Sequence, residues 1–104
     1  MWRPILIGIV VWPLAAVSAW AQQGDAEVGR QLTQNWCTTC HVVDKEGHGA
    51  DVGPALPALL GDGLRTSDEI RGWLTDPHPP MPNFDLTRQE IEDIVAYLES
   101  LTVQ

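Results

Sequence analysis

The chain has 104 residues, with 14 acidic against 6 basic side chains and a formal net charge of −8 at pH 7. This length suits one domain at most. The acidic balance argues against nucleic-acid binding, which requires a basic surface. It agrees with docking on proteins that carry basic patches, although acidic side chains also serve simply to keep a protein in solution.

Residues 1–21 have the pattern of a secretory signal peptide. A positive start at Arg3 precedes a mainly apolar run, and residues 19–21 (Ala-Trp-Ala) form the small-x-small pattern of a cleavage site. Cleavage would leave residues 22–104, whose formal charge is 5 − 14 = −9. The alternative is an uncleaved membrane anchor facing the periplasm, but Pro13 interrupts the run, which is shorter than the ~20 residues that span a bilayer. We therefore expect export to the periplasm and no membrane span after cleavage.

The first predicted helix runs from about Asp25 to Trp36. Asp25 is a suitable N-cap residue, and Val28, Leu32 and Trp36 recur at four-residue spacing. This stripe predicts the face that the helix buries.

A C-x-x-C-H motif follows the first helix at Cys37, Cys40 and His41. This is the pattern of covalent haem attachment, in which each cysteine sulfur forms a thioether with one vinyl group of the porphyrin. His41 follows at once, so its imidazole can bind the iron as the proximal ligand. A large apolar cofactor would also complete the core of a domain this small. The motif therefore predicts one haem c with its iron.

Three other uses of the two cysteines remain. A thioredoxin-like redox pair requires a βαβ context, which this sequence does not offer. A zinc site would need His48 or His78 to complete its ligands, and no second pair has suitable spacing. A plain disulfide would suit an oxidising compartment. We favour haem because the motif includes the histidine directly after the second cysteine.

The segment of residues 42–57 is rich in glycine and proline and should turn often. A short helical turn at residues 58–61 is weakly indicated. A second helix is predicted over residues 67–75, because Thr66 and Glu69 form a capping box before an apolar face.

Residues 77–82 read Pro-His-Pro-Pro-Met-Pro, which predicts a stiff, extended segment near polyproline II. Met81 is the only methionine after the leader, and a rigid segment can hold its thioether against an iron. Beside a haem motif we interpret it as the distal ligand, although a lone methionine more often packs in a core. His78 is the rival ligand and His48 a weaker one.

The last predicted helix begins after the capping box of Thr87 and Glu90. Its apolar side chains follow at helical intervals, at Ile91, Ile94, Val95, Leu98 and Leu101. No segment shows the alternation of a strand, so the predicted class is all-α.

In this order the motifs resemble those of class I c-type cytochromes over nearly all of residues 24–101. Gly29, eight residues before Cys37, matches a small residue in that family's first helix, and the run around Tyr97 is similar to its last helix. The resemblance implies three main helices wrapped around one covalently bound haem, with Gly29 packed against Tyr97. Thr33 departs from the family, where an aromatic side chain is common.

The resemblance also implies roles for two loop residues. Pro54 matches the proline whose carbonyl accepts a hydrogen bond from the proximal imidazole, which orients the ring. Residues 73–77 are similar to the segment that leads into the methionine ligand of short bacterial members, here Met81. The lysine ring of mitochondrial members is absent, so their partners cannot be transferred to this chain.

The expected function is one-electron transfer by a monohaem carrier in a periplasmic electron-transport chain. Such a protein is not an enzyme: it exchanges electrons with redox partner proteins and has no small-molecule substrate. One alternative is a haem subunit of a larger oxidoreductase. The other is a haem-based sensor with an open sixth position, in which Trp73 and Phe84 would line a distal pocket instead of packing in a core.

Overall fold

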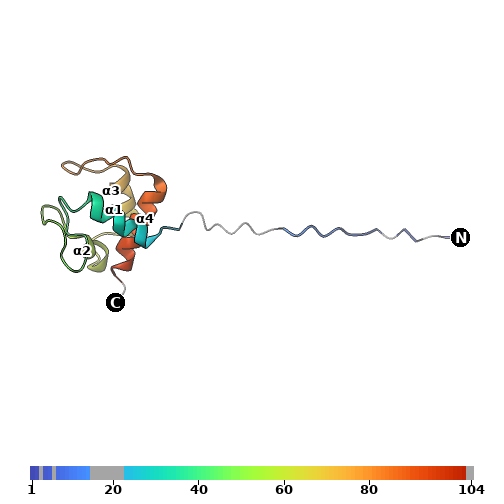
Figure 1. The fold of residues 1–104 in the computed structure, drawn as a ribbon. Coiled ribbons are helices and arrows are strands. Elements are labelled where there is room, and N and C mark those ends of the chain that lie inside the picture. The colour runs from blue at the N-terminus through green and yellow to red at the C-terminus, as the bar shows by residue number, and fades with distance from the viewer. Residues whose placement is uncertain (3, 6, 15–22, 103–104) are drawn as a thin grey trace.

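The structure is a computed structural model that describes residues 1–102 except residues 3, 6 and 15–22. Its helices are α1 (Ala26–Trp36), α2 (Leu56–Gly61), α3 (Ser67–Thr75) and α4 (Arg88–Ser100) (Figure 1). Within the described residues, one antiparallel bridge joins Val42 to Gly49. The predicted all-α class is confirmed, with one difference: the weak turn expected at 58–61 is a helix that already begins at Leu56.

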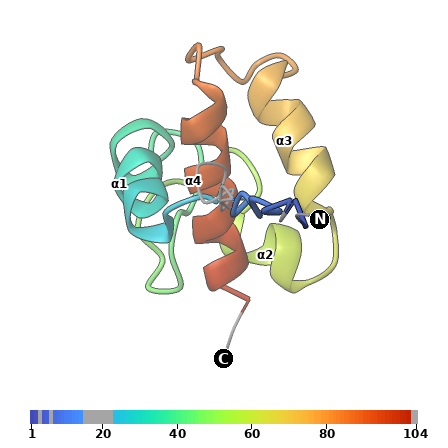
Figure 2. The same ribbon diagram turned by 90° about the vertical axis from the view of Figure 1, so that its right-hand side faces the viewer.

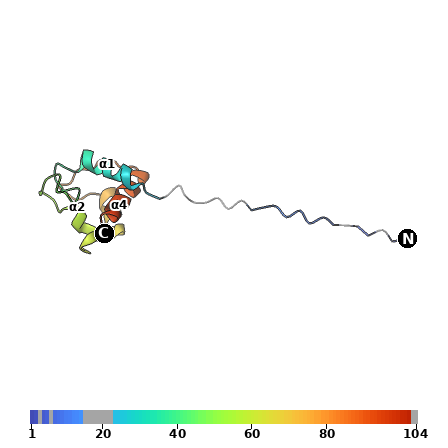
Figure 3. The same cartoon turned by 60° about the horizontal axis from the view of Figure 1, so that its bottom comes forward.

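Helix α4 lies at the centre of the helical body. Helix α1 packs on one side of it, and α2 and α3 lie on the other (Figures 2 and 3). The contact of α1 with α4 is the most extensive between two helices. Helix α4 also supplies most of the buried apolar side chains, which are Val43, Leu56, Leu59, Ile70, Ile91, Ile94, Val95, Tyr97 and Leu98.

The helices begin at the residues that their caps predict. The Asp25 carboxylate accepts hydrogen bonds from the first backbone N–H groups of α1. These groups have no partner within the helix, so the cap stabilises the start by about 1 kcal/mol. Both predicted capping boxes are complete, namely Thr66 with Glu69 before α3 and Thr87 with Glu90 before α4.

Helices α1 and α4 cross at a glycine. A Cβ atom at Gly29 would lie 1.9 Å from the carbonyl oxygen of Asp93 and 2.8 Å from the Cβ of Tyr97. The predicted contact of Gly29 with Tyr97 is therefore confirmed, and it extends to the backbone of α4. Thr33 is fully buried one turn further along, and its hydroxyl donates to the carbonyl of Arg30 at 2.9 Å.

The prediction that Val28, Leu32 and Trp36 form the buried face of α1 is wrong. The side chains of Val28 and Trp36 are 39% and 52% exposed, and Leu32 is only partly buried. The residues buried in this helix are Gly29 and Thr33. Two helix backbones can approach closely only where the side chains between them are small. The large apolar side chains at four-residue spacing therefore do not lie at the contact of α1 with α4.

The described residues before position 15 form neither a helix nor a strand and extend away from the helical body (Figure 1). Among the residues that the structure describes, no helix combines the length and apolarity needed to cross a membrane. The predicted cleavage site at residues 19–21 lies outside the described residues.

Candidate functional site

The C-x-x-C-H motif forms a tight turn at the end of α1. The backbone N–H of Cys37 donates to the Thr33 carbonyl at 2.9 Å, which continues the helical pattern into the motif. The N–H groups of Cys40 and His41 both donate to the Cys37 carbonyl, at 3.2 and 2.9 Å. These bonds bring two free thiols and one imidazole onto a single turn of backbone.

The imidazole of His41 is oriented by Pro54. Its Nδ1 atom lies 2.6 Å from the Pro54 carbonyl oxygen. A carbonyl can only accept, so Nδ1 carries the proton and Nε2 retains its lone pair in the neutral ring. This tautomer is the one that a histidine needs to bind a metal through Nε2. The contact that the family resemblance implied for Pro54 is present.

Gly53 packs against the face of the same ring. A Cβ atom there would lie 2.6 Å from Cε1 of His41, so any side chain would push the imidazole aside. The Gly53 N–H donates to the Cys40 carbonyl at 2.6 Å, so the glycine that packs on the His41 ring (the glycine cradle) is bonded to the motif. A second glycine, Gly49, has φ +115° and brings its backbone against the His41 carbonyl oxygen. The glycines predicted to make turns therefore also make room for the histidine.

Burial raises the pKa of the Cys37 thiol to about 11, and the neighbouring Cys40 adds to the increase. The Cys37 thiol therefore stays protonated at neutral pH. A thioredoxin-like pair instead requires a cysteine of lowered pKa, because the thiolate is the nucleophile. The protonation state counts against that alternative.

The other two histidines make side-chain contacts with residues outside the motif. The His48 side chain is 72% exposed, and its Nδ1 lies 2.6 Å from Oδ2 of Asp44. His78 is exposed and packs edge-on against Trp73, with ring centroids 5.3 Å apart. The Trp73 ring also carries Arg65, whose Cζ lies 4.8 Å from the ring centroid. His48 and His78 thus serve local packing and surface pairing.

Met81 is half-buried in the segment that connects α3 to α4. Its backbone N–H donates to the His78 carbonyl at 3.0 Å, which closes a turn, and the peptide bond between Pro79 and Pro80 is cis. The prediction of an extended polyproline segment is therefore wrong, because a hydrogen bond across the prolines folds the chain back. Met81 comes from a different part of the chain than the motif, whose His41 contacts Pro54 and whose Cys40 and His41 are bonded to Cys37.

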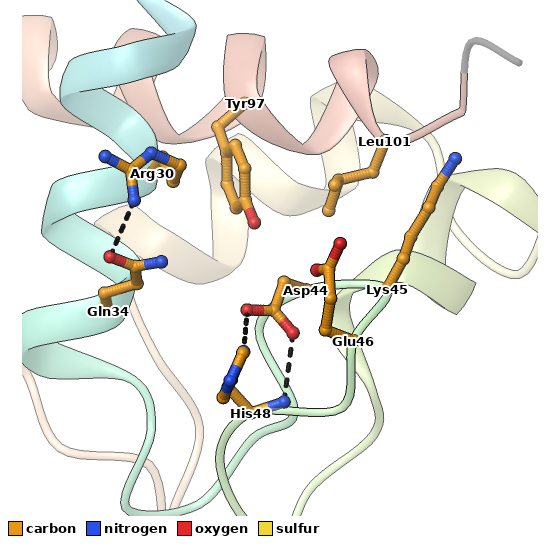
Figure 4. A pocket seen from close by; sticks show the side chains of 8 residues that line it. All are labelled: Arg30, Gln34, Asp44, Lys45, Glu46, His48, Tyr97 and Leu101. Carbon is orange, nitrogen blue, oxygen red and sulfur yellow. Dashed lines mark hydrogen bonds and ion pairs between the residues drawn. The ribbon is translucent and has the colours of Figure 1, made fainter.

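The sequence did not predict a hydrogen bond between α4 and the backbone just after the motif. The buried hydroxyl of Tyr97 donates to the Val43 carbonyl at 2.7 Å. The only signal in the sequence was that this residue is the single tyrosine of the chain. Beside it lies a pocket of about 380 Å³ lined by Arg30, Gln34, Asp44, Lys45, Glu46, His48, Tyr97 and Leu101 (Figure 4). This pocket includes neither the cysteines nor His41.

The motif residues fit a covalently held haem. Two thiols lie on one turn, the adjacent imidazole is held as the Nε2-ligating tautomer, and glycine leaves room for the ring. Together with an all-helical fold, this donor set defines a c-type cytochrome.

Comparison with known proteins agrees with that class. Residues 24–98 match the family model described as cytochrome c oxidase, cbb3-type, subunit III. Cytochrome c-552 of Bradyrhizobium diazoefficiens is 38% identical over 96 residues, which cover 88% of this chain and 89% of the relative. A cytochrome c-553-like protein of Synechocystis is 35% identical over 83 residues, or 78% of this chain and 73% of the relative.

The solved structures show the same fold. Ferric cytochrome c-550 from Paracoccus versutus superposes with a TM-score of 0.59 at 20% identity, and the match covers 78% of this chain and all of that one. The chain belongs to this cytochrome c family and is a small bacterial class I c-type cytochrome. It binds haem c with its iron and acts as an electron carrier.

Proposed function

We propose that Cys37 and Cys40 carry the haem through thioethers and that His41 is the proximal iron ligand. The observation that carries this proposal is the hydrogen bond of His41 Nδ1 to the Pro54 carbonyl at 2.6 Å. It leaves Nε2 as the ligating atom, one residue beyond the second cysteine. A histidine that only packed in a core would need neither the glycine cradle nor two partly buried thiols beside it.

We further propose Met81 as the distal ligand. It is the only methionine of residues 22–104, its side chain is half-buried, and a hydrogen-bonded turn fixes its backbone. A thioether is a soft ligand that favours ferrous iron, so this choice raises the reduction potential. Burial of the bound haem would act in the same direction, because the ferric state carries more charge.

The bound haem supplies one-electron exchange between ferric and ferrous iron. The protein's own part is to hold the ligands still. Pro54 keeps the His41 ring in one orientation and increases its donor strength through the Nδ1–H bond. Ligands that stay in place in both oxidation states keep the reorganisation energy small, which favours fast transfer.

The finer role is that of a free periplasmic carrier rather than an enzyme. The charge of −9 on residues 22–104 supports docking on partners with basic patches. Electron-exchange rates should then fall as salt rises, because exposed charges are screened over about 10 Å at 0.1 M salt. Rates that do not depend on ionic strength with any basic partner would contradict this docking mode.

Residues 1–21 are the proposed leader. The intact mass of material recovered from the periplasm should correspond to a chain that begins at Gln22 and carries one haem. A mass that retains the leader would instead support the anchored form.

Attachment is tested with Cys40→Ala beside the matched control Thr39→Ala, both expressed in cells with a haem-ligation system. Thr39 is exposed in the same turn and contributes no thiol. The control should give red protein that keeps its pigment through acid-acetone extraction. Cys40→Ala should lose most holoprotein, and Cys37→Ala with Cys40→Ala should lose all of it. Retention of covalent haem in the double variant would refute the assignment.

The second candidate function is a haem subunit held in a larger oxidoreductase. The observation that favours it is the matching family, whose description is that of an oxidase subunit. Gel filtration of protein purified from its native host separates the two: a carrier elutes as a small protein, and a subunit elutes with a large complex.

A further inference from the structure

A buried hydrogen bond connects α4 to the segment that follows His41. The Tyr97 side chain is 5% exposed, and its hydroxyl donates to the carbonyl of Val43, which is fully buried, at 2.7 Å. Val43 comes two residues after His41. The bond therefore joins the centre of the helical body to the backbone beside the proposed proximal ligand.

A second bond relates the same backbone to the segment that orients the histidine. The Leu56 N–H donates to the Val42 carbonyl at 2.8 Å, and Leu56 comes two residues after Pro54. The two carbonyls that follow His41 are thus held by α4 and by the segment after Pro54. The His41–Pro54 hydrogen bond of 2.6 Å joins residues that directly precede these anchored positions.

The surroundings of Tyr97 keep its hydroxyl protonated, so that it can donate a hydrogen bond. Burial raises the pKa of Tyr97 above its ordinary value, and the carboxylates of Asp44 and Glu46 act in the same direction. Arg30 acts in the opposite direction but does not outweigh them. The side chain therefore remains protonated at neutral pH, when it can hold the Val43 carbonyl.

We infer that Tyr97 is a positioning residue for the proximal ligand: its hydroxyl fixes the backbone after His41 so that the imidazole keeps its bond to Pro54. This inference rests on the proposed role of His41. Loss of the hydroxyl would leave the Val43 carbonyl buried without a donor, which favours movement of that backbone. A weaker Nδ1–H bond makes the imidazole a poorer donor to iron, destabilises the ferric state and raises the potential.

The test is Tyr97→Phe in the holoprotein, because it keeps the ring against α1 and removes only the hydroxyl. We expect the ferrous-to-ferric equilibrium to shift toward ferrous by about twofold to fivefold, less than for loss of a direct partner of the ligand. The matched control is Thr33→Val, which also removes a buried hydroxyl at the contact of α1 with α4. It should lower the melting temperature and leave the potential unchanged.

A second measurement covers the case in which Tyr97→Phe does not fold. Tyr97 is the only tyrosine, so growth on 3-fluorotyrosine labels this position alone. The fluorinated hydroxyl is a stronger donor, and at pH 6 it should shift the equilibrium toward ferric, opposite to Tyr97→Phe. An unchanged potential in the fluorinated protein, or equal shifts in Tyr97→Phe and Thr33→Val, would overturn the inference.

The inference can fail separately from the proposed function. The paramagnetic ¹H NMR spectrum of the ferric wild-type protein should show hyperfine-shifted resonances of a ligating His41 imidazole. If these are present and Tyr97→Phe leaves both their shifts and the potential unchanged, only the role of Tyr97 is refuted. If the wild type lacks them, the assignment of His41 as proximal ligand is refuted.

Discussion

The two segments that supply the proposed iron ligands are held in different ways. The proximal segment, residues 37–54, is anchored by bonds from distant parts of the chain, such as those of Tyr97 and Leu56. The distal segment, residues 76–87, has bonds that are local, such as the turn that ends at Met81. Long-range hydrogen bonds therefore hold the segment of His41, whereas the segment of Met81 has local hydrogen bonds and is held to the helices by apolar packing, such as that of Phe84 edge-on against Trp36 with ring centroids 5.4 Å apart. We expect the distal ligand to dissociate from the iron before the proximal one when the protein is partly unfolded.

The largest expected effect is that of Met81→Ala on the redox site. The haem should stay attached and His41 bound, while the reduction potential falls by about 0.1–0.3 V because the axial thioether is lost. Loss of the weak red iron–thioether band and binding of carbon monoxide to the reduced protein would report the open position. His78→Ala is the matched control from the same segment. If Met81→Ala leaves the spectrum unchanged and His78→Ala alters it, the distal ligand is His78.

The next largest effect concerns the helix that leads into the proximal segment. Gly29→Ala places a Cβ 1.9 Å from the Asp93 carbonyl oxygen, so α1 and α4 must move apart. We expect a loss of about 3 kcal/mol or more in the free energy of unfolding, measured by guanidinium denaturation of the holoprotein.

Gly72→Ala is the matched control in the helix that leads into the distal segment. Apart from its chain neighbours and the backbone of its own helix, no atom lies within 4 Å of a Cβ built at Gly72. Alanine has the higher helix propensity, so this variant should gain about 0.5–1 kcal/mol. Equal effects of the two substitutions would contradict the view that only the proximal helix is closely packed on α4.

A smaller effect is expected where α3 meets α4. The Arg71 guanidinium contacts both carboxylate oxygens of Glu92, at 2.8 and 3.2 Å, with side chains 36% and 24% exposed. Because the pair is partly solvated, Arg71→Met should cost only about 0.5–1 kcal/mol, and less at high salt. Asp68→Asn is the control, since Asp68 contacts the same arginine but is 91% exposed. Equal losses in the two variants would show that the link between helices is not what stabilises α3.

The smallest effect concerns pH and the proximal segment. The backbone N–H of His48 holds the pKa of Asp44 below its usual range, and the imidazole of His48 adds to this effect. A lowered folded-state pKa contributes stability above the unfolded value near 4 and loses it as the pH falls through the folded value. Asp44→Asn should therefore flatten the melting-temperature profile on its acid side, below about pH 4. The exposed Asp51→Asn is the control, and identical acid slopes in both variants would contradict this role.

The sequence was informative wherever a local rule decides the outcome. Caps at Asp25, Thr66 and Thr87 depend on bonds within a few residues, and the helices begin where those bonds predicted. The C-x-x-C-H motif is equally local, because its spacing is that of one backbone turn. The apolar face of α4 was also predicted correctly except for Leu101, which follows the helix and is only partly buried, since a central helix buries its side chains in the expected period.

The sequence was misleading where the outcome depends on a partner far along the chain. The buried face of α1 is set by the backbone of α4, which needs the small Gly29 and not the bulkier Trp36. The residues after Pro77 are a separate case, because the bond that decides their shape is local: proline favours an extended backbone, but the hydrogen bond from Met81 to His78 turns the chain back. Neither the composition of a segment nor the spacing of its residues predicts these contacts.

The order of residues alone determined the class of this protein, its helices, its cofactor and the pair of thiols that we assign to it. The family resemblance implied that Pro54 orients His41, but only the tertiary structure showed the hydrogen bond to this carbonyl thirteen residues away, which sets the tautomer, and the glycine packed against the ring. The anchoring of that region by Tyr97 was decided in the same way, by a hydrogen bond across 54 residues. Such long-range bonds form only after the helices pack, so a local sequence pattern does not predict them.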